Sequence, residues 1–211
     1  MSPVVAGAIC CTISVLGYSA ANVCLRQLAA LGCDPAWVTC NKEVVTVVIL
    51  GGWLLGQAFR GLPTFPTGRP LLFLILAGLA TQLGGNVLMQ WAFGIVGLAV
   101  MIPAMYAFNL TFTAIFGRIL LGERVATRSM GALGMFLASL AMLAWGAYVS
   151  SSAGPAKHSL LVTASIGAAC LAGIIYAMLG ITIRHCVTGT TRLTAVAVLI
   201  TGMGVVTLGP L

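Results

Sequence analysis

The sequence predicts an all-α protein, a polytopic bundle of membrane-spanning helices. Sixty per cent of the 211 residues are apolar and only 6% are charged, and the mean hydropathy of +1.11 lies far above the soluble globular range. No charge occurs between Arg69 and Arg118. As one helix this run would be roughly 70 Å long, about twice the apolar depth of a bilayer. It must therefore fold back, and we expect the turn within residues 91–97, where Gly94 and Gly97 interrupt the apolar run.

Charge-free windows between Pro- and Gly-containing loops define the individual spans. None shows the period-2 alternation of a membrane β-barrel, so each is expected to be a helix. The predicted spans are residues 3–29, 36–59, 70–92, 96–120, 128–149, 159–183 and 192–211. The first lacks a basic leader, so we expect it to remain as a span.

The positive charges predict the orientation of these spans. Most of the ten Lys and Arg residues flank the second, fourth and sixth loops, and short loops rich in Lys and Arg remain cytoplasmic. The N-terminus is therefore expected in the cytoplasm, in a protein of the bacterial inner membrane. The basic residues are scattered and form no patch with interleaved aromatics, so no nucleic-acid partner is expected.

An internal repeat is suggested by three identities at one common offset. Tyr18 and Arg26 fall on Tyr176 and Arg184, and a glycine of the second span falls on a glycine of the seventh. We interpret residues 1–149 as a five-helix repeat and residues 159–211 as the first two helices of a second repeat. Because five is odd, the second copy would be inverted in the membrane, as in many transporters.

Residues 90–143 resemble the EamA-type repeat of the drug/metabolite transporter superfamily. The resemblance is carried by Trp91-Ala-Phe, by Pro103 in the fourth span, by Leu121-Gly-Glu-Arg before the fifth, and by Gly131-Ala-Leu-Gly134. Asp34-Pro35 followed by Lys42 also resembles the family's second span, although the family more often has Arg at that position.

This resemblance implies a secondary, non-ATP carrier that moves small organic metabolites or drug-like solutes by alternating access. Members of the family usually have ten spans, so three C-terminal spans would be missing here.

Lys42 and Glu43 lie about two turns inside the second span, where charge is costly unless it is paired or faces water. Neighbours on a helix point about 100° apart, so we expect these two not to pair with each other and at least one to face inward. Alternatively, Lys42 snorkels to the headgroups and Glu43 lies in the interface. In a dry cavity, Glu43 would be suited to proton coupling.

Further polar side chains within the spans are candidates for binding a solute. Gln82, Asn86 and Gln90 recur every four residues and would either line a cavity or bond to a neighbouring helix. Pro103 is predicted to kink the fourth span as a hinge near polar groups, or to be a tolerated bend. The remaining candidates are Tyr18, Asn22, Tyr106, Asn109 and Tyr176, although a membrane Tyr is commonly an interface anchor.

Enzymatic chemistry finds no support in the sequence. It contains no Gly-x-Ser-x-Gly, His-Glu-x-x-His or Walker motif, and His158 and His185 end spans on opposite sides of the predicted membrane. We expect no catalytic residue, cofactor or metal. The expected partners are a small-molecule solute and the lipid bilayer, and Gly131 and Gly134 favour a close helix contact within the chain or in a homodimer.

Two other functions compete with a carrier. The span count also fits a non-transporting seven-helix receptor or sensor, although a retinal protein needs a lysine in its seventh span and residues 192–211 contain none. The third reading is a degenerate transporter fragment.

Overall fold

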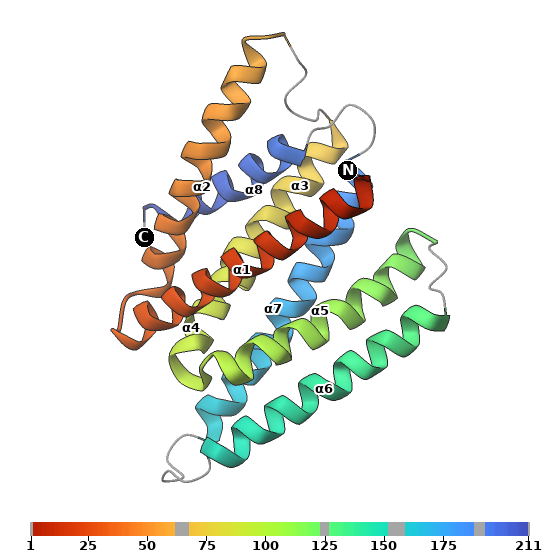
Figure 1. Ribbon diagram of the computed structural model, residues 1–211. Coiled ribbons are helices and arrows are strands. Elements are labelled where there is room, and N and C mark those ends of the chain that lie inside the picture. The colour runs from red at the N-terminus through yellow and green to blue at the C-terminus, as the bar shows by residue number, and fades with distance from the viewer. Residues whose placement is uncertain (1, 62–67, 123–126, 152–158, 188–192, 211) are drawn as a thin grey trace.

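The computed structural model describes residues 2–61, 68–122, 127–151, 159–187 and 193–210, and all their regular elements are helical. The elements are α1 (Pro3–Ala30), α2 (Pro35–Ala58), α3 (Arg69–Ala80), a π-helix η1 (Thr81–Asn86), α4 (Val87–Val96), α5 (Leu98–Leu120), α6 (Thr127–Ser151), α7 (Ser159–Cys186) and α8 (Leu193–Leu208) (Figure 1). The predicted all-α class is confirmed.

Five helical segments are long and apolar enough to cross a bilayer, which marks an integral membrane protein. They are Val4–Ala30, Pro35–Ala58, Arg69–Val96, Leu98–Leu120 and Leu160–Cys186. Two further apolar helices, Met130–Ser139 within α6 and Leu193–Leu208, are shorter. The count of seven spans therefore stays a prediction.

A capping side chain followed by proline determines where each of the first two helices begins. Asp34 Oδ1 accepts hydrogen bonds from the backbone N–H groups of Ala36 and Trp37, both at 2.9 Å, and Pro35 occupies the first helical position, where no N–H is needed. Ser2 and Pro3 begin α1 in the same way. The Asp34-Pro35 pair thus has a structural role as a helix cap.

The long apolar run folds back at one residue. Gly97 has φ of +73° between α4 and α5, a conformation that side-chain-bearing residues rarely adopt. The turn is tighter than we expected from residues 91–97, because α4 continues through Gly94 to Val96. α5 then remains one helix through the buried Pro103. The carbonyl that Pro103 leaves unpaired belongs to Ala99, in the first turn of α5 and not beside Tyr106 or Asn109.

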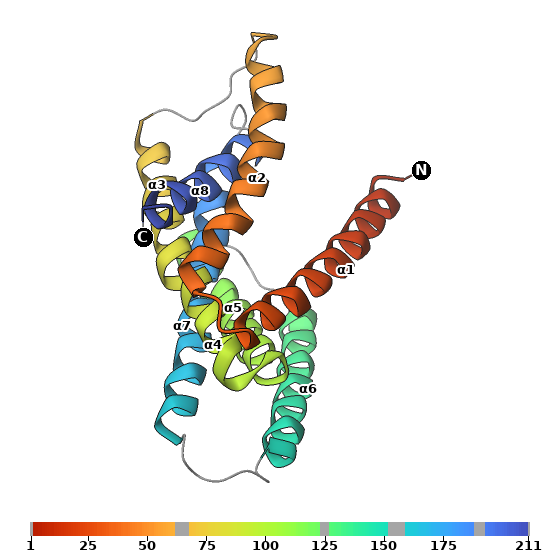
Figure 2. The same ribbon diagram turned by 90° about the vertical axis from the view of Figure 1, so that its left-hand side faces the viewer.

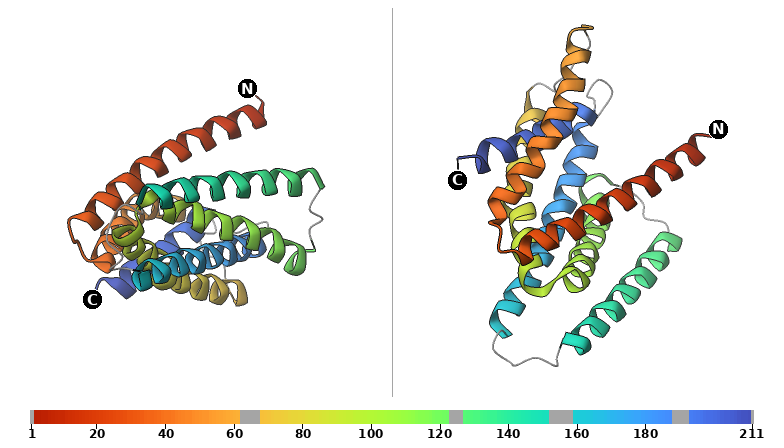
Figure 3. Two further views of the ribbon diagram at one scale, coloured as in Figure 1. Left: turned by 90° about the horizontal axis from the view of Figure 1, so that it is seen from below. Right: turned by 60° about the vertical axis from the view of Figure 1, so that its left-hand side comes forward.

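The helices form an open arrangement around α5 and α7, which pack against each other. α6 runs along the other side of α5, and α8 crosses obliquely between α2 and α3 (Figures 1 and 2). The N-terminal half of α1 leans away from the remaining helices, and only its C-terminal half approaches α4 (Figures 2 and 3). Among the described side chains of α1, only Asn22 is buried.

The tightest helix contact depends on Gly173 of α7. A Cβ atom there would lie 2.9 Å from Phe108 Cβ and 3.0 Å from the backbone nitrogen of Asn109, and it would also collide with the carbonyl oxygen of Met105. Because Gly173 has no side chain, α5 and α7 approach closely, as helices do where small residues lie at membrane helix interfaces.

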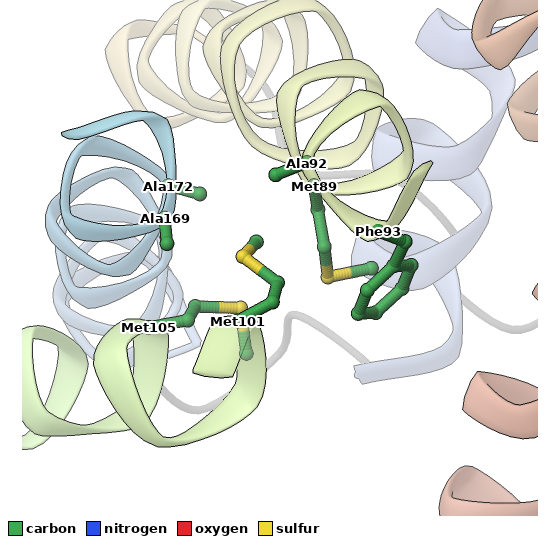
Figure 4. Close-up of a cluster of buried hydrophobic side chains, with 7 residues drawn as sticks. All are labelled: Met89, Ala92, Phe93, Met101, Met105, Ala169 and Ala172. Carbon is green, nitrogen blue, oxygen red and sulfur yellow. The ribbon is translucent and has the colours of Figure 1, made fainter. Parts of the chain in front are cut away.

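Beside this contact, methionines of α4 and α5 meet alanines of α7 (Figure 4). The buried cluster comprises Met89, Ala92, Phe93, Met101, Met105, Ala169 and Ala172. Flexible thioether side chains fill the irregular space above the small alanines. The cluster thereby fixes the α4–α5 hairpin against α7, next to the π-helix.

The π-helix η1 interrupts the third membrane segment, and sequence reasoning did not predict it. Its end is marked by a bond from the backbone N–H of Val87 to the carbonyl of Gln82, five residues earlier. The wider turn changes which residues share a face, and such insertions are frequent at functional sites. The sequence signal is Gly84-Gly85 among Thr81, Gln82 and Asn86.

Gly131 and Gly134 of α6 make no close helix contact within the described chain. No atom lies within 4 Å of a Cβ built at either glycine. The expected contact within the chain is therefore not formed, and the homodimer stays a prediction. Residues 123–126, which include most of the Leu-Gly-Glu-Arg junction, lie outside the described residues.

Candidate functional site

A partly buried ion pair lies in α2, with the Lys42 side chain 34% exposed. Lys42 Nζ is 3.2 Å from Glu43 Oε1, and the Glu43 residue is only 4% exposed. Both residues lie about 10 Å along the helix from Pro35, well inside an apolar segment. Our expectation that the two would not pair is wrong: their backbone directions diverge, but the long lysine side chain bends back to the carboxylate. Pairing lowers the cost of charge at this depth.

Asn86 of η1 is the centre of the polar contacts around this pair. Its Oδ1 accepts hydrogen bonds from Lys42 Nζ at 3.1 Å and from the Tyr176 hydroxyl of α7. Its Nδ2 donates to Glu43 Oε1 at 3.2 Å and to Gln82 Oε1 at 2.7 Å. A cation and a phenol require an acceptor, and a carboxylate requires a donor, so the partners determine the orientation of the amide. We call these five residues the Asn86 network.

Gln82 extends the Asn86 network to α8. Its Nε2 donates to the carbonyl oxygen of Ile200 at 3.1 Å. Gly204, one turn further along α8, lies directly against the network: a Cβ there would be 2.8 Å from Gln82 Cδ and 3.0 Å from Glu43 Cγ. Sequence reasoning missed Gly204. The sequence shows two glycines close together in this largely apolar span, Gly202 and Gly204, and does not indicate which of them meets another helix.

Gln90 is separate from the other two amides. It is 2% exposed, and its Nε2 donates to the carbonyl oxygen of Leu25 at 2.9 Å. Gln90 therefore bonds α4 to α1, which is the neighbouring-helix alternative for this residue. The predicted stripe divides because η1 changes the helical register between Gln82 and Gln90.

A pocket of about 630 Å³ lies between α1, α5 and α6. It brings together three predicted residues, Tyr18, Asn22 and Tyr106. Its full lining is Ser14, Val15, Tyr18, Ser19, Asn22, Ile102, Tyr106 and Phe136. Asn22 is 6% exposed, and its Oδ1 is buried without a hydrogen-bond partner. We call this space the α1–α5–α6 pocket.

Tyr176 lies between the pocket and the Asn86 network. Its hydroxyl bonds to Asn86, and it lies near Tyr18, Tyr106 and Glu43. Gly85 faces its ring, since a Cβ there would lie 3.5 Å from Tyr176 Cζ. Tyr176 is therefore a neighbour of both groups of residues.

Asn109 does not join either group through a described contact. Its Oδ1 accepts a long hydrogen bond of 3.5 Å from Thr113 on the same helix, and its backbone nitrogen lies at the Gly173 contact. The structure thus brings together Lys42, Glu43, Gln82, Asn86 and Tyr176 in one group and Tyr18, Asn22 and Tyr106 in the next. Gln90, Asn109 and Pro103 lie at helix contacts nearby.

The Asn86 network thus joins one cation and one carboxylate to three uncharged polar side chains, and the α1–α5–α6 pocket adds hydroxyl groups and a second amide. No protein-family model matches the chain, and no curated protein or solved structure matches it.

Proposed function

We propose that the protein is a secondary carrier that moves a small organic solute across the membrane by alternating access. The observation that carries this proposal is the Lys42–Glu43 ion pair of α2, in which the carboxylate is buried and the lysine is partly exposed. The pair is bonded through Asn86 to Tyr176 of α7. A charged pair is expensive in this setting and is characteristic of ion and substrate pathways.

The chemistry of the Asn86 network supports coupling between binding and helix position. Protonation of Glu43 would remove its ion pair with Lys42 and weaken its bond from Asn86 Nδ2. The Asn86 amide would then be less firmly held and could reorient relative to Gln82 and Tyr176. Gln82 bonds to the backbone of α8, so the change would reach both α7 and α8. Glu43 is therefore the proposed proton-coupling residue.

The repeat interpretation agrees with this proposal. Tyr18 and Tyr176, which the common offset pairs, lie within electrostatic reach of each other. In inverted-repeat carriers, the binding site lies at the interface between the two repeats. The resemblance to EamA-type repeats, the seven spans, the cytoplasmic N-terminus and the bacterial inner membrane belong to the same proposal. A seven-helix receptor remains the second candidate by span count alone.

The proposal is tested by reconstituting the full chain into liposomes and measuring uptake of a panel of radiolabelled small solutes, with and without an imposed pH gradient. Empty liposomes give the background. We expect at least one solute to accumulate with the proton gradient, and Glu43→Gln to abolish the effect of pH. Absence of uptake across the panel would contradict the carrier proposal. The same pH dependence in Glu43→Gln would contradict the coupling role of Glu43.

A further inference from the structure

We propose that the α1–α5–α6 pocket binds a neutral solute with a ring-sized apolar body and at least one N–H or O–H donor, and that this donor bonds to Asn22 Oδ1. The inference rests on the proposed carrier function and assigns the substrate class of its site.

The unpaired carbonyl of Asn22 calls for a donor. Its Oδ1 is buried with no hydrogen-bond partner, and the same side chain lines the pocket. An unpaired polar atom is costly in a membrane interior, where water does not replace the missing partner. A lipid acyl chain would fill the space but would leave this oxygen unpaired. A ligand with a donor group satisfies it once the amide turns this covered oxygen toward the pocket.

The lining selects against charge. All eight lining residues are uncharged, and the polar ones are hydroxyls and one amide. An ammonium or carboxylate would lose its hydration without meeting an opposite charge in the lining. The Lys42 and Glu43 charges nearby are paired with each other and with Asn86. The pocket is therefore suited to a neutral ligand.

The size and the aromatic walls point to an apolar body. About 630 Å³ lies within the range of pockets that hold drug-sized molecules. Tyr18, Tyr106 and Phe136 supply aromatic rings from three different helices, and such rings pack favourably against another ring in offset or edge-to-face geometry. The ligand would lie between these rings with its donor directed to α1.

The test is equilibrium dialysis of four probes against the full chain in lipid nanodiscs, with empty nanodiscs subtracted. The probes share one ring system and differ in the end group: 2-(2-naphthyl)ethanol, its methyl ether, 2-(2-naphthyl)ethylamine and 2-naphthylacetate. We expect the alcohol to bind about tenfold tighter than the ether, because only the alcohol donates to a buried acceptor. The cationic and anionic probes should bind at least about tenfold more weakly than the alcohol.

Variants separate the hydrogen bond from the apolar contact. Asn22→Leu, of similar shape, should abolish the difference between alcohol and ether. Phe136→Ala should weaken both probes by a similar factor and keep their ratio, and its exposed position makes misfolding a minor concern. Thr12→Val, on the same helix but bonded to its own backbone, should change neither probe.

Equal binding of alcohol and ether to the unmodified chain would overturn the inference and indicate a pocket for an acyl chain only. An unchanged ratio in Asn22→Leu would also overturn it. Selective binding of the alcohol without uptake of any solute would contradict the carrier function and leave this binding site intact. Solute uptake without selective binding of the alcohol would overturn this inference and leave the carrier function intact.

Discussion

Replacing Asn86 by leucine, which has nearly the same shape, removes four hydrogen bonds at one position. Two of these bonds involve the charged groups of Lys42 and Glu43, and two involve Gln82 and Tyr176. The ion pair between Lys42 and Glu43 remains possible, since it does not pass through Asn86. The loss is therefore confined to the amide bonds.

The expected cost follows from these four bonds. Hydrogen bonds to charged groups contribute about 1.5 kcal/mol each. For the two neutral bonds, one within η1 and one to α7, we use the value of about 0.6 kcal/mol measured for side-chain bonds in membrane helices. Asn86→Leu should therefore lower the free energy of unfolding by about 4 kcal/mol. The matched control is Gln90→Met in the same membrane segment, because this buried amide makes one described bond, to Leu25. It should cost about 1 kcal/mol or less.

The assay is reversible unfolding by sodium dodecyl sulfate in mixed micelles, followed by tryptophan fluorescence. A cycle with Tyr176→Phe measures the coupling through one of the bonds, and the double variant should cost less than the two single variants added together. Equal costs for Asn86→Leu and Gln90→Met would refute the reasoning, because Asn86 would then be an ordinary buried amide.

Three further substitutions use the same assay. Gly204→Ala should destabilise by about 1–3 kcal/mol, because the added methyl would meet Gln82 and Glu43, whereas Gly202→Ala has open space and should be nearly neutral. Gly173→Ala should lower the free energy of unfolding at least as much as Gly204→Ala, since backbone atoms of α5 block the added methyl. Gly167→Ala on the same helix has open space and should not destabilise. Equal effects of Gly173→Ala and Gly167→Ala would contradict the close α5–α7 contact. Glu43→Gln should cost about 1 kcal/mol, because Lys42 loses its carboxylate partner but keeps its bond to Asn86 and is partly exposed, and a neutral result would show that the pair does not stabilise the fold.

The sequence was sufficient to predict the helical class and the approximate helix positions, because these depend on local features: the length of each apolar run and the Pro and Gly residues that end it. Gly97 illustrates the limit of this reasoning: the turn was predicted within seven residues, but only a positive φ identifies the one that forms it. Glycines at 94 and 97 look equivalent in the sequence, whereas one continues a helix and the other ends it.

The site was less accessible to sequence reasoning because its geometry depends on contacts between helices. The Lys42–Glu43 pair depends on side-chain flexibility that a helical-wheel argument neglects. The π-helix separates Gln90 from Gln82 and Asn86, although all three follow one another at four-residue spacing. Gly204 acquires its role only from the approach of α8 to Gln82. None of these relations is a local property of the chain.

The most direct test of the carrier account is whether the α1–α5–α6 pocket opens to both sides of the membrane. The background is a chain in which all seven cysteines are replaced by alanine. Ser19→Cys is then introduced in the pocket lining. A membrane-impermeant methanethiosulfonate is applied either to the outside or to the lumen of proteoliposomes. Leu16→Cys, which replaces an exposed residue outside the pocket lining on the same helix, is the lipid-facing control and should react from neither side. The account predicts that Ser19→Cys reacts from both sides; no reaction, or reaction from one side only under every gradient imposed, would contradict it.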